Sequence, residues 1–211
     1  APTALFVTRG FADLLVIGTQ QRPDLFTLRI ERQPPLHAHV AEIPERVDST
    51  GAVVTPLDRE AAGAAARDAV AAGCRVAAIS LMNAYRNDVH ERILEEILLE
   101  AGFERVSRSS RVSAAIGYLD RTWTTVVNAY LEPVVSGYVA HVEEALRGGG
   151  SSDSSLHLMT SSGGLVRAAE FRPKDSLLSG PAGGVIGAVH AAAEAGFDRV
   201  IAFDMGGTST D

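Results

Sequence analysis

Apolar residues of this chain follow two spacings in alternation, one typical of helices and one typical of strands. An alanine-rich segment at residues 58–72 has helical spacing, with Asp58 able to cap its start and Gly73 able to end it. The next run, residues 76–82, is short and almost wholly apolar, as in a strand that is buried on both faces. A helix followed at once by such a strand begins an α/β pattern.

A second helix and strand follow directly. Asp88 and Glu91 have the spacing of a capping box, and the apolar residues after them share one helical face up to Gly102. Residues 104–107 then have the composition of a strand. Because His90 and Glu91 stand at the helix start, outside any zinc-binding spacing, we expect them to serve the helix start and not catalysis.

The N-terminal part of the chain predicts shorter elements. Residues 5–7 indicate a strand, and residues 11–18 indicate a brief helix that ends at a glycine. Turn-forming residues 48–51 separate two runs with β-branched residues, 40–47 and 52–55. A β-hairpin is the simplest interpretation of these two runs.

A long helix is expected from Asp120 to about Arg147, where apolar residues recur at helical spacing. Pro133 should kink or divide this helix, because proline lacks the N–H that the helix interior needs. The polar residues 148–155 that follow predict a flexible connection.

The C-terminal part predicts another round of alternation. Residues 156–160 indicate a strand, residues 161–164 a tight turn, residues 181–195 a helix of small residues and residues 199–203 a final buried strand. Repeated alternation of helices and strands favours a layered α/β fold.

Composition and charge narrow the functional classes. The 211 residues carry a formal net charge of −7, which argues against a surface that binds nucleic acid or an anionic membrane. No run is apolar for the length of a membrane span. Cys74 is the single cysteine, so we expect a small core residue and a reducing, cytoplasmic compartment.

The strongest chemical signal is IAFDMGGTSTD at residues 201–211, an apolar run that leads directly into two glycines. Gly206 and Gly207 allow backbone N–H groups to approach phosphate oxygens closely. Thr208 and Ser209 can donate hydrogen bonds to phosphate. The carboxylates Asp204 and Asp211 flank these donors, and Asp204 can hold a hydrated magnesium ion. The alternative is an ordinary glycine turn between two strands.

Other polar motifs carry weaker signals. His37 and His39 form an H-x-H pair in a proline-rich segment, but a third metal ligand at a recognisable spacing is missing. The turn at residues 161–164 could offer N–H groups to an anion, yet the same letters form ordinary tight turns, and a G-x-S-x-G motif is missing. Catalytic acids, bases or nucleophiles are therefore not identified.

Two resemblances to known protein families favour the phosphate-binding interpretation of the glycine loop over an ordinary turn. The last thirty or so residues resemble the superfamily of actin, sugar kinases and chaperone ATPases, in which a connecting helix precedes a strand and a second phosphate loop. Nearly the whole chain resembles the hydantoinase/oxoprolinase family in seven consecutive blocks. The blocks are TRGFADLLVIGTQQRP (residues 8–23), ERVDSTGAVVTPLD (45–58), LMNAYRNDVHE (81–91), RTWTTVVNAYLEPV (121–134), MTSSGGL (159–165), LLSGPAGGV (177–185) and FDMGGTSTD (203–211).

The family resemblance implies a fold and two domains. The fold would be part of a two-lobe, actin-like ATPase of the ribonuclease H-like type. Residues 1–105 would be the C-terminal part of the family's N-terminal domain, and residues 106–211 would begin the hydantoinase A/oxoprolinase domain and end after a phosphate loop. A first phosphate loop would precede Ala1 and an adenosine-binding segment would follow, so the isolated fragment should bind ATP weakly or not at all.

The resemblance also implies an activity, ATP-dependent opening of a cyclic amide such as 5-oxoproline or a hydantoin. ATP and magnesium would be the cofactors, bound by Asp204, Gly206, Gly207, Thr208, Ser209 and Asp211. Three alternatives stay open: an ATP-dependent ketone carboxylase subunit, a non-catalytic ATP-binding module of the actin or chaperone type, and a fragment without activity. A hydantoinase B-type partner and an oligomer are also implied.

Specific positions are left open by the resemblance. Ala12 and Thr19 stand where family members usually carry arginine, and Ser162 stands where they carry asparagine. Substrate recognition or surface drift would explain these departures equally well. Arg121, Thr122, Thr124, Thr125 and Asn128 form a polar block on the long helix, which either faces substrate or another lobe or is buried and satisfied by backbone groups.

Overall fold

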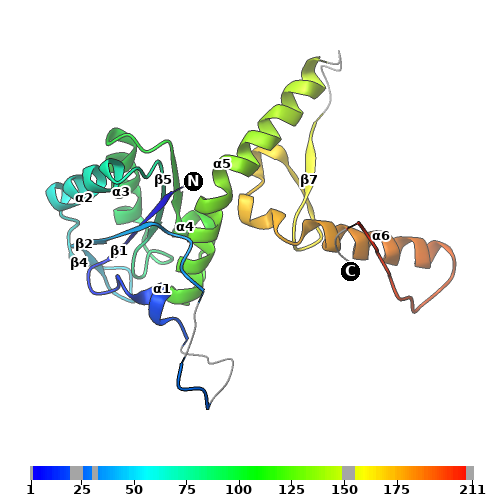
Figure 1. Cartoon of the computed structure of the whole chain (residues 1–211), viewed down its shortest axis with the longest axis horizontal. Coiled ribbons are helices and arrows are strands. Elements are labelled where there is room, and N and C mark those ends of the chain that lie inside the picture. Colours follow the sequence, from blue (N-terminus) through cyan, green and yellow to red (C-terminus); the bar gives the residue numbers. More distant parts are fainter. Residues whose placement is uncertain (1, 20–25, 30–32, 149–154, 208–211) are drawn as a thin grey trace. The chain divides into compact units, whose positions relative to one another are not determined.

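The computed structural model describes residues 2–19, 26–29, 33–148 and 155–207 of the chain. These residues divide into two compact units, Ala1–Pro133 and Val134–Asp211. Figure 1 shows the elements of both, and each unit is described by itself.

A four-stranded parallel sheet forms the centre of the first unit. Its strands are β1 (Thr3–Thr8), β2 (His39–Ile43), β5 (Val76–Ser80) and β6 (Arg105–Arg108), in the order β2-β1-β5-β6. Leu5 of β1 pairs with Val40 on one side and Ala78 on the other. Every residue of β1 and β5 is buried, as expected for central strands covered on both faces.

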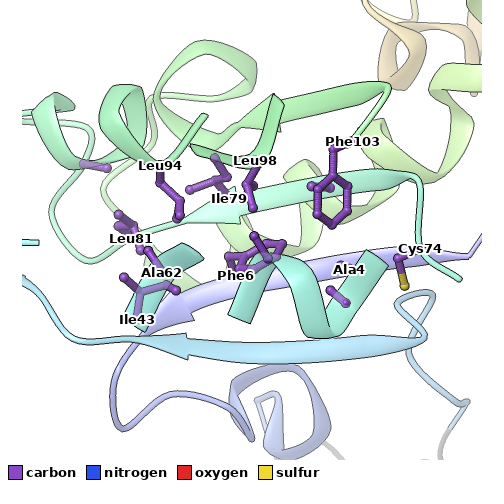
Figure 2. Close-up of a cluster of buried hydrophobic side chains, with 14 residues drawn as sticks. Ala4, Phe6, Ile43, Ala62, Cys74, Ile79, Leu81, Leu94, Leu98 and Phe103 are labelled. Atoms are coloured by element: carbon purple, nitrogen blue, oxygen red, sulfur yellow. The ribbon is translucent and has the colours of Figure 1, made fainter. Parts of the chain in front are cut away.

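Two helices, α2 (Arg59–Ala71) and α3 (Val89–Glu100), cover one face of this sheet. The Asp58 carboxylate accepts a hydrogen bond from Ala61 N at 3.0 Å, which confirms the predicted cap, and Gly73 after the helix has a φ of 88° that favours glycine. Figure 2 shows the core between helices and sheet, whose members come from both. They include Phe6, Ile79, Ala62, Leu94, Leu98, Phe103 and Cys74.

The opposite face of the sheet packs against α1 (Leu14–Ile17) and the first half of α5 (Tyr118–Gly148). Leu5 and Val7 of β1 lie here with Val126 and Ala129 of α5. The short helix α4 (Ser109–Val112), which the sequence did not predict, connects β6 to the approach of α5. The α/β fold class is confirmed, whereas the actin-like two-lobe arrangement stays a prediction.

The predicted hairpin is present in a shorter form. Only β3 (Arg46–Val47) and β4 (Val53–Thr55) pair in antiparallel fashion around the turn, while β2 joins the parallel sheet. The single strand expected at residues 40–47 was therefore wrong. Pro44 stands between β2 and β3, and a residue without an N–H cannot continue the ladder of either strand.

The second unit contains the rest of α5, a hairpin and α6 (Ser179–Glu194). The hairpin pairs β7 (His157–Met159) with β8 (Leu165–Arg167), and two short 3₁₀ helices, Ala168–Glu170 and Pro173–Ser176, lead from it to α6. Pro133 lies inside one continuous helix and does not divide it, although the boundary between the units falls there.

The strand expected at residues 199–203 was wrong. These residues form no strand, and Ile201 and Phe203 are 96% and 71% exposed. A strand gains its backbone hydrogen bonds only from neighbouring strands, and the described part of the second unit offers none beyond its single hairpin. Across the described residues of both units, none of the helices has the length and apolar character needed to cross a membrane.

Candidate functional site

The predicted phosphate loop follows α6 in the second unit. Asp204 and Gly207 are exposed, as is Gly206 between Met205 and Gly207, and a side chain built on Gly207 would meet no atom within 4 Å. Thr208, Ser209 and Asp211, the other proposed ligands, lie outside the described residues. The structure therefore presents the first half of the loop to solvent and leaves its role a prediction.

The chemistry of the described loop residues fits a magnesium–phosphate group in part. An exposed carboxylate oxygen is a ligand that magnesium accepts, and glycine backbone can approach phosphate closely. Over the described residues, histidine, cysteine, aspartate and glutamate side chains form no group of three or more able to hold a metal. Among these described residues, neither the His37 and His39 pair nor Asp204 belongs to such a group.

A second polar cluster lies in the first unit, at the carboxyl ends of the parallel strands. Thr8 ends β1, Ser80 ends β5 and Ser109 follows β6, and all three are buried. Glu45 lies two residues beyond the end of β2 and is 3% exposed. In open parallel sheets, ligands bind beyond this edge, so the cluster is a candidate functional site.

One half of the cluster is built around the Glu45 carboxylate. The Thr8 hydroxyl donates to Glu45 Oε1, and His90 Nδ1 lies 2.7 Å from Glu45 Oε2. Met82 N in turn donates to Thr8 Oγ1 at 2.8 Å. Because an ionised carboxylate can only accept hydrogen bonds, the contact requires a hydrogen on His90 Nδ1, and in the neutral form of the ring Nε2 is then an acceptor.

The other half is built around Glu91, which is fully buried. Its carboxylate accepts hydrogen bonds from Leu81 N at 3.1 Å, Ser109 Oγ at 2.6 Å and Ser110 N at 2.9 Å. Burial raises the pKa of this carboxyl group, and the three donors oppose that rise. Glu91 thus connects the ends of β5 and β6.

Arg121 joins this half from α5, and its side chain is fully buried. Its guanidinium donates to Ser109 Oγ at 3.1 Å and to the carbonyl oxygens of Leu81, Ala115 and Ile116 at 3.0, 2.7 and 3.2 Å. The rings of Tyr85 and Tyr118 lie 5.5 and 5.2 Å from its central carbon. Burial lowers the pKa of Arg121, and the nearby negative charge of Glu91 opposes that effect.

The polar block on α5 is therefore satisfied from within the chain, and all of it is buried except the half-buried Thr124. Thr122, Thr124 and Thr125 donate to the carbonyl oxygens four residues before them, each at 2.7 Å. Asn128 donates to Ser107 Oγ at 3.0 Å. Of the two interpretations, satisfied burial is the one that the described residues support.

The expected capping role of His90 and Glu91 was wrong. The helix start at Asp88 has no side-chain capping hydrogen bond, and Asp88 binds Arg92 and Arg108 instead. His90 and Glu91 point their polar atoms into the cluster. A signal for it was present, since four of the seven resembling blocks begin or end at residues that meet here: Thr8, Glu45, Glu91 and Arg121.

Comparisons with known proteins cover nearly the whole chain. A family model described as hydantoinase/oxoprolinase matches residues 121–211, and a model of the hydantoinase/oxoprolinase N-terminal region matches residues 1–102. The 5-oxoprolinase of Saccharomyces cerevisiae is 36% identical over 99% of this chain and 18% of its own length.

Two solved structures are similar over the same extent. Nucleotide-free acetone carboxylase superposes with a TM-score of 0.88 at 27% identity, and the ATP-dependent caprolactamase of Pseudomonas jessenii with a TM-score of 0.80 at 30% identity. Each match covers 99% of this chain and 31% of the solved one. The chain thus spans between 18% and 31% of the length of these relatives.

Proposed function

Because the chain belongs to the hydantoinase/oxoprolinase family, we propose that it forms part of an enzyme that uses ATP to open a cyclic amide such as 5-oxoproline or a hydantoin. The observation that carries the proposal is the match over 99% of the chain to both a 5-oxoprolinase and an ATP-dependent caprolactamase. Both names describe enzymes that hydrolyse a cyclic amide. Which cyclic amide this protein opens is part of the proposal.

The loop from Asp204 to Asp211 would hold the phosphates of ATP. Backbone N–H groups of Gly206 and Gly207 would face phosphate oxygens, Thr208 and Ser209 would donate hydroxyl hydrogen bonds, and Asp204 would bind magnesium through water. Bound magnesium–ATP supplies the phosphoryl group that makes the amide carbon a better electrophile for water. Asp204 would need this cation to lie near phosphate, because a bare carboxylate would repel the phosphate charges.

The test is magnesium–ATP turnover by the full-length protein with and without 5-oxoproline and hydantoins, measured as ADP release. The variant Asp204→Ala should lose ring-dependent turnover by about a hundredfold or more, since phosphoryl transfer depends on placing the metal and the phosphates. Asp198→Ala is the matched control, because it removes an aspartate six residues earlier in the same exposed segment. Equal rates for the two variants would contradict the assigned role of Asp204.

A ketone carboxylase is the second candidate, favoured by the superposition on acetone carboxylase. ADP release that requires a ketone together with bicarbonate, and ignores cyclic amides, would select it. Release that ignores both would favour an ATP-binding module of the actin or chaperone type.

Partners and location complete the proposal. The similarity to an acetophenone carboxylase gamma subunit is a further reason to expect a second subunit, and we place a hydantoinase B-type subunit or domain beside this chain in an oligomer. The single cysteine favours a cytoplasmic location. Co-purification of the full-length protein with its partner, followed by mass measurement of the complex, tests the assembly.

A further inference from the structure

The polar cluster at the carboxyl edge of the sheet has one acceptor that the chain does not use. His90 is 4% exposed and its Nδ1 is bound to Glu45, but its Nε2 has no partner among the described residues. In that part of the chain, His37 Nδ1 and Ser110 Oγ are buried without a hydrogen-bond partner, and buried Arg108 Nε lies 2.9 Å from the Glu95 carboxylate. His90 Nε2 also lacks a hydrogen-bond partner but is not among the fully buried atoms, so we infer that it is accessible to solvent.

The same cluster has a cation without a counterion. Arg46, next to Glu45, is half-buried, and its guanidinium lies 2.9 Å from Met82 Sδ, 3.4 Å from the Arg9 carbonyl oxygen and 5.7 Å from the centre of the Phe11 ring. No carboxylate of the described residues pairs with it. A thioether, a carbonyl and a ring face satisfy a guanidinium less well than a carboxylate does.

These two groups belong to one connected set of contacts. Arg46 contacts Met82, the Met82 N–H binds Thr8, and Thr8 and His90 both bind the carboxylate of Glu45. The set fixes the imidazole tautomer and ties the loop after β5 to the loop after β2. Both loops lie at the edge of a parallel sheet where ligands bind.

We propose that this edge of the first unit is a binding site for a small carboxylate that also carries an N–H or O–H group. Arg46 pairs with the ligand carboxylate, and His90 Nε2 accepts the hydrogen bond from the ligand N–H or O–H. Glu45 and Thr8 hold the ring in the orientation that leaves Nε2 free. That the ligand is a cyclic amide rests on the proposed function. The site then favours cyclic amides that carry a carboxylate over neutral ones.

The test uses nitrogen-15 NMR of the histidine rings in the full-length protein, without ATP. His90→Gln identifies the His90 signals. In the neutral form of its ring, His90 should show a protonated Nδ1 and an unprotonated Nε2. The opposite tautomer would overturn the proposal before any ligand is added.

Two probes then differ only in the carboxylate, 5-oxoproline and 2-pyrrolidinone. The first should shift the His90 Nε2 signal with saturation, and the second should bind at least about tenfold more weakly, since a charge-assisted hydrogen bond is lost. Equal binding of the two probes, or no response to either, would overturn the proposal. The titration contains no ATP and therefore tests ligand binding alone. Its failure would leave the proposed ATP-dependent activity standing, and failure of the turnover assay would leave the binding result standing.

Variants assign the carboxylate contact. Arg46→Gln should remove the preference for 5-oxoproline, while Arg86→Gln, which removes the same charge from an exposed position on the loop after β5, should keep it. Methyl proton spectra establish that both variants are folded. Loss of the preference in both variants would show a general charge effect and would overturn the assignment to Arg46.

Discussion

Replacement of Arg121 by methionine tests whether the buried polar cluster holds the carboxyl edge of the sheet together. Arg121 donates to four acceptors, two of which, the carbonyls of Ala115 and Ile116, belong to exposed residues and can bind water after the change. The Leu81 carbonyl and Ser109 stay buried, and each lost hydrogen bond to a charged group costs about 1.5–3 kcal/mol. Methionine keeps much of the volume, so the cavity contribution is small.

The free energy of unfolding should therefore fall by about 3–5 kcal/mol. Urea unfolding followed by circular dichroism measures it, with Arg111→Met as the control, because Arg111 is exposed and should change stability by less than about 0.5 kcal/mol. Arg121→Lys keeps the positive charge but not the planar guanidinium with its several N–H donors, so the free energy of unfolding should fall by about 1–3 kcal/mol. A loss below about 1 kcal/mol in Arg121→Met would refute the reasoning.

A double-mutant cycle makes the same test more specific. Glu91 is buried beside Arg121, and removing the guanidinium leaves its carboxylate without the nearby positive charge. Glu91→Gln combined with Arg121→Met should therefore destabilise the chain by less than the sum of the two single changes. Additive losses would mean that the two residues act independently.

Three further changes probe other parts of the chain. A hydrogen bond from Arg92 holds the pKa of Asp88 below its ordinary value, so this pair stabilises the fold above the ordinary carboxyl pKa and ceases to do so as pH falls through the lowered one. Asp88→Asn should therefore cost up to about 1 kcal/mol at pH 7 and progressively less as the pH falls through the lowered pKa, measured by urea unfolding across an acidic pH series. Gly51→Ala should cost about 1–2 kcal/mol, because Gly51 has a φ of 93° and a Cβ there would lie 3.1 Å from Arg86 Cγ; a neutral result in thermal unfolding would contradict this. Ile201→Ser should change stability by less than about 0.5 kcal/mol, since Ile201 is 96% exposed, and a larger loss would mean that residue 201 is buried in solution.

The sequence predicted the central elements of the first unit because their signals are local. The cap at Asp58, the glycine stop at Gly73 and the apolar run of β5 each depend on a few neighbouring residues, and all three are confirmed. The division of residues 40–47 between two sheets was not predicted, since spacing shows that a strand forms and does not show which strand it joins. Pro44 was the one local sign of the break.

The candidate sites divide in the same way. The glycine loop is contiguous in sequence, so its motif could be recognised, although Thr208, Ser209 and Asp211 lie outside the described residues. The cluster around Glu45 and Glu91 brings together residues as far apart as Thr8 and Arg121, and a local rule assigned His90 and Glu91 to a helix cap instead. The domain boundary near residue 105 stays a prediction. The first family model ends at residue 102 and the second begins at residue 121.

The central claim is that this chain belongs to an enzyme whose ATP turnover is coupled to opening a cyclic amide. The most direct measurement follows ADP and the ring-opened product together, in the full-length protein with magnesium, ATP and 5-oxoproline or a hydantoin. The account predicts that ADP forms only when the ring is present, in a fixed ratio to the opened product, and that Asp204→Ala abolishes both. ADP release that is independent of the ring, or that instead requires a ketone and bicarbonate, would contradict it.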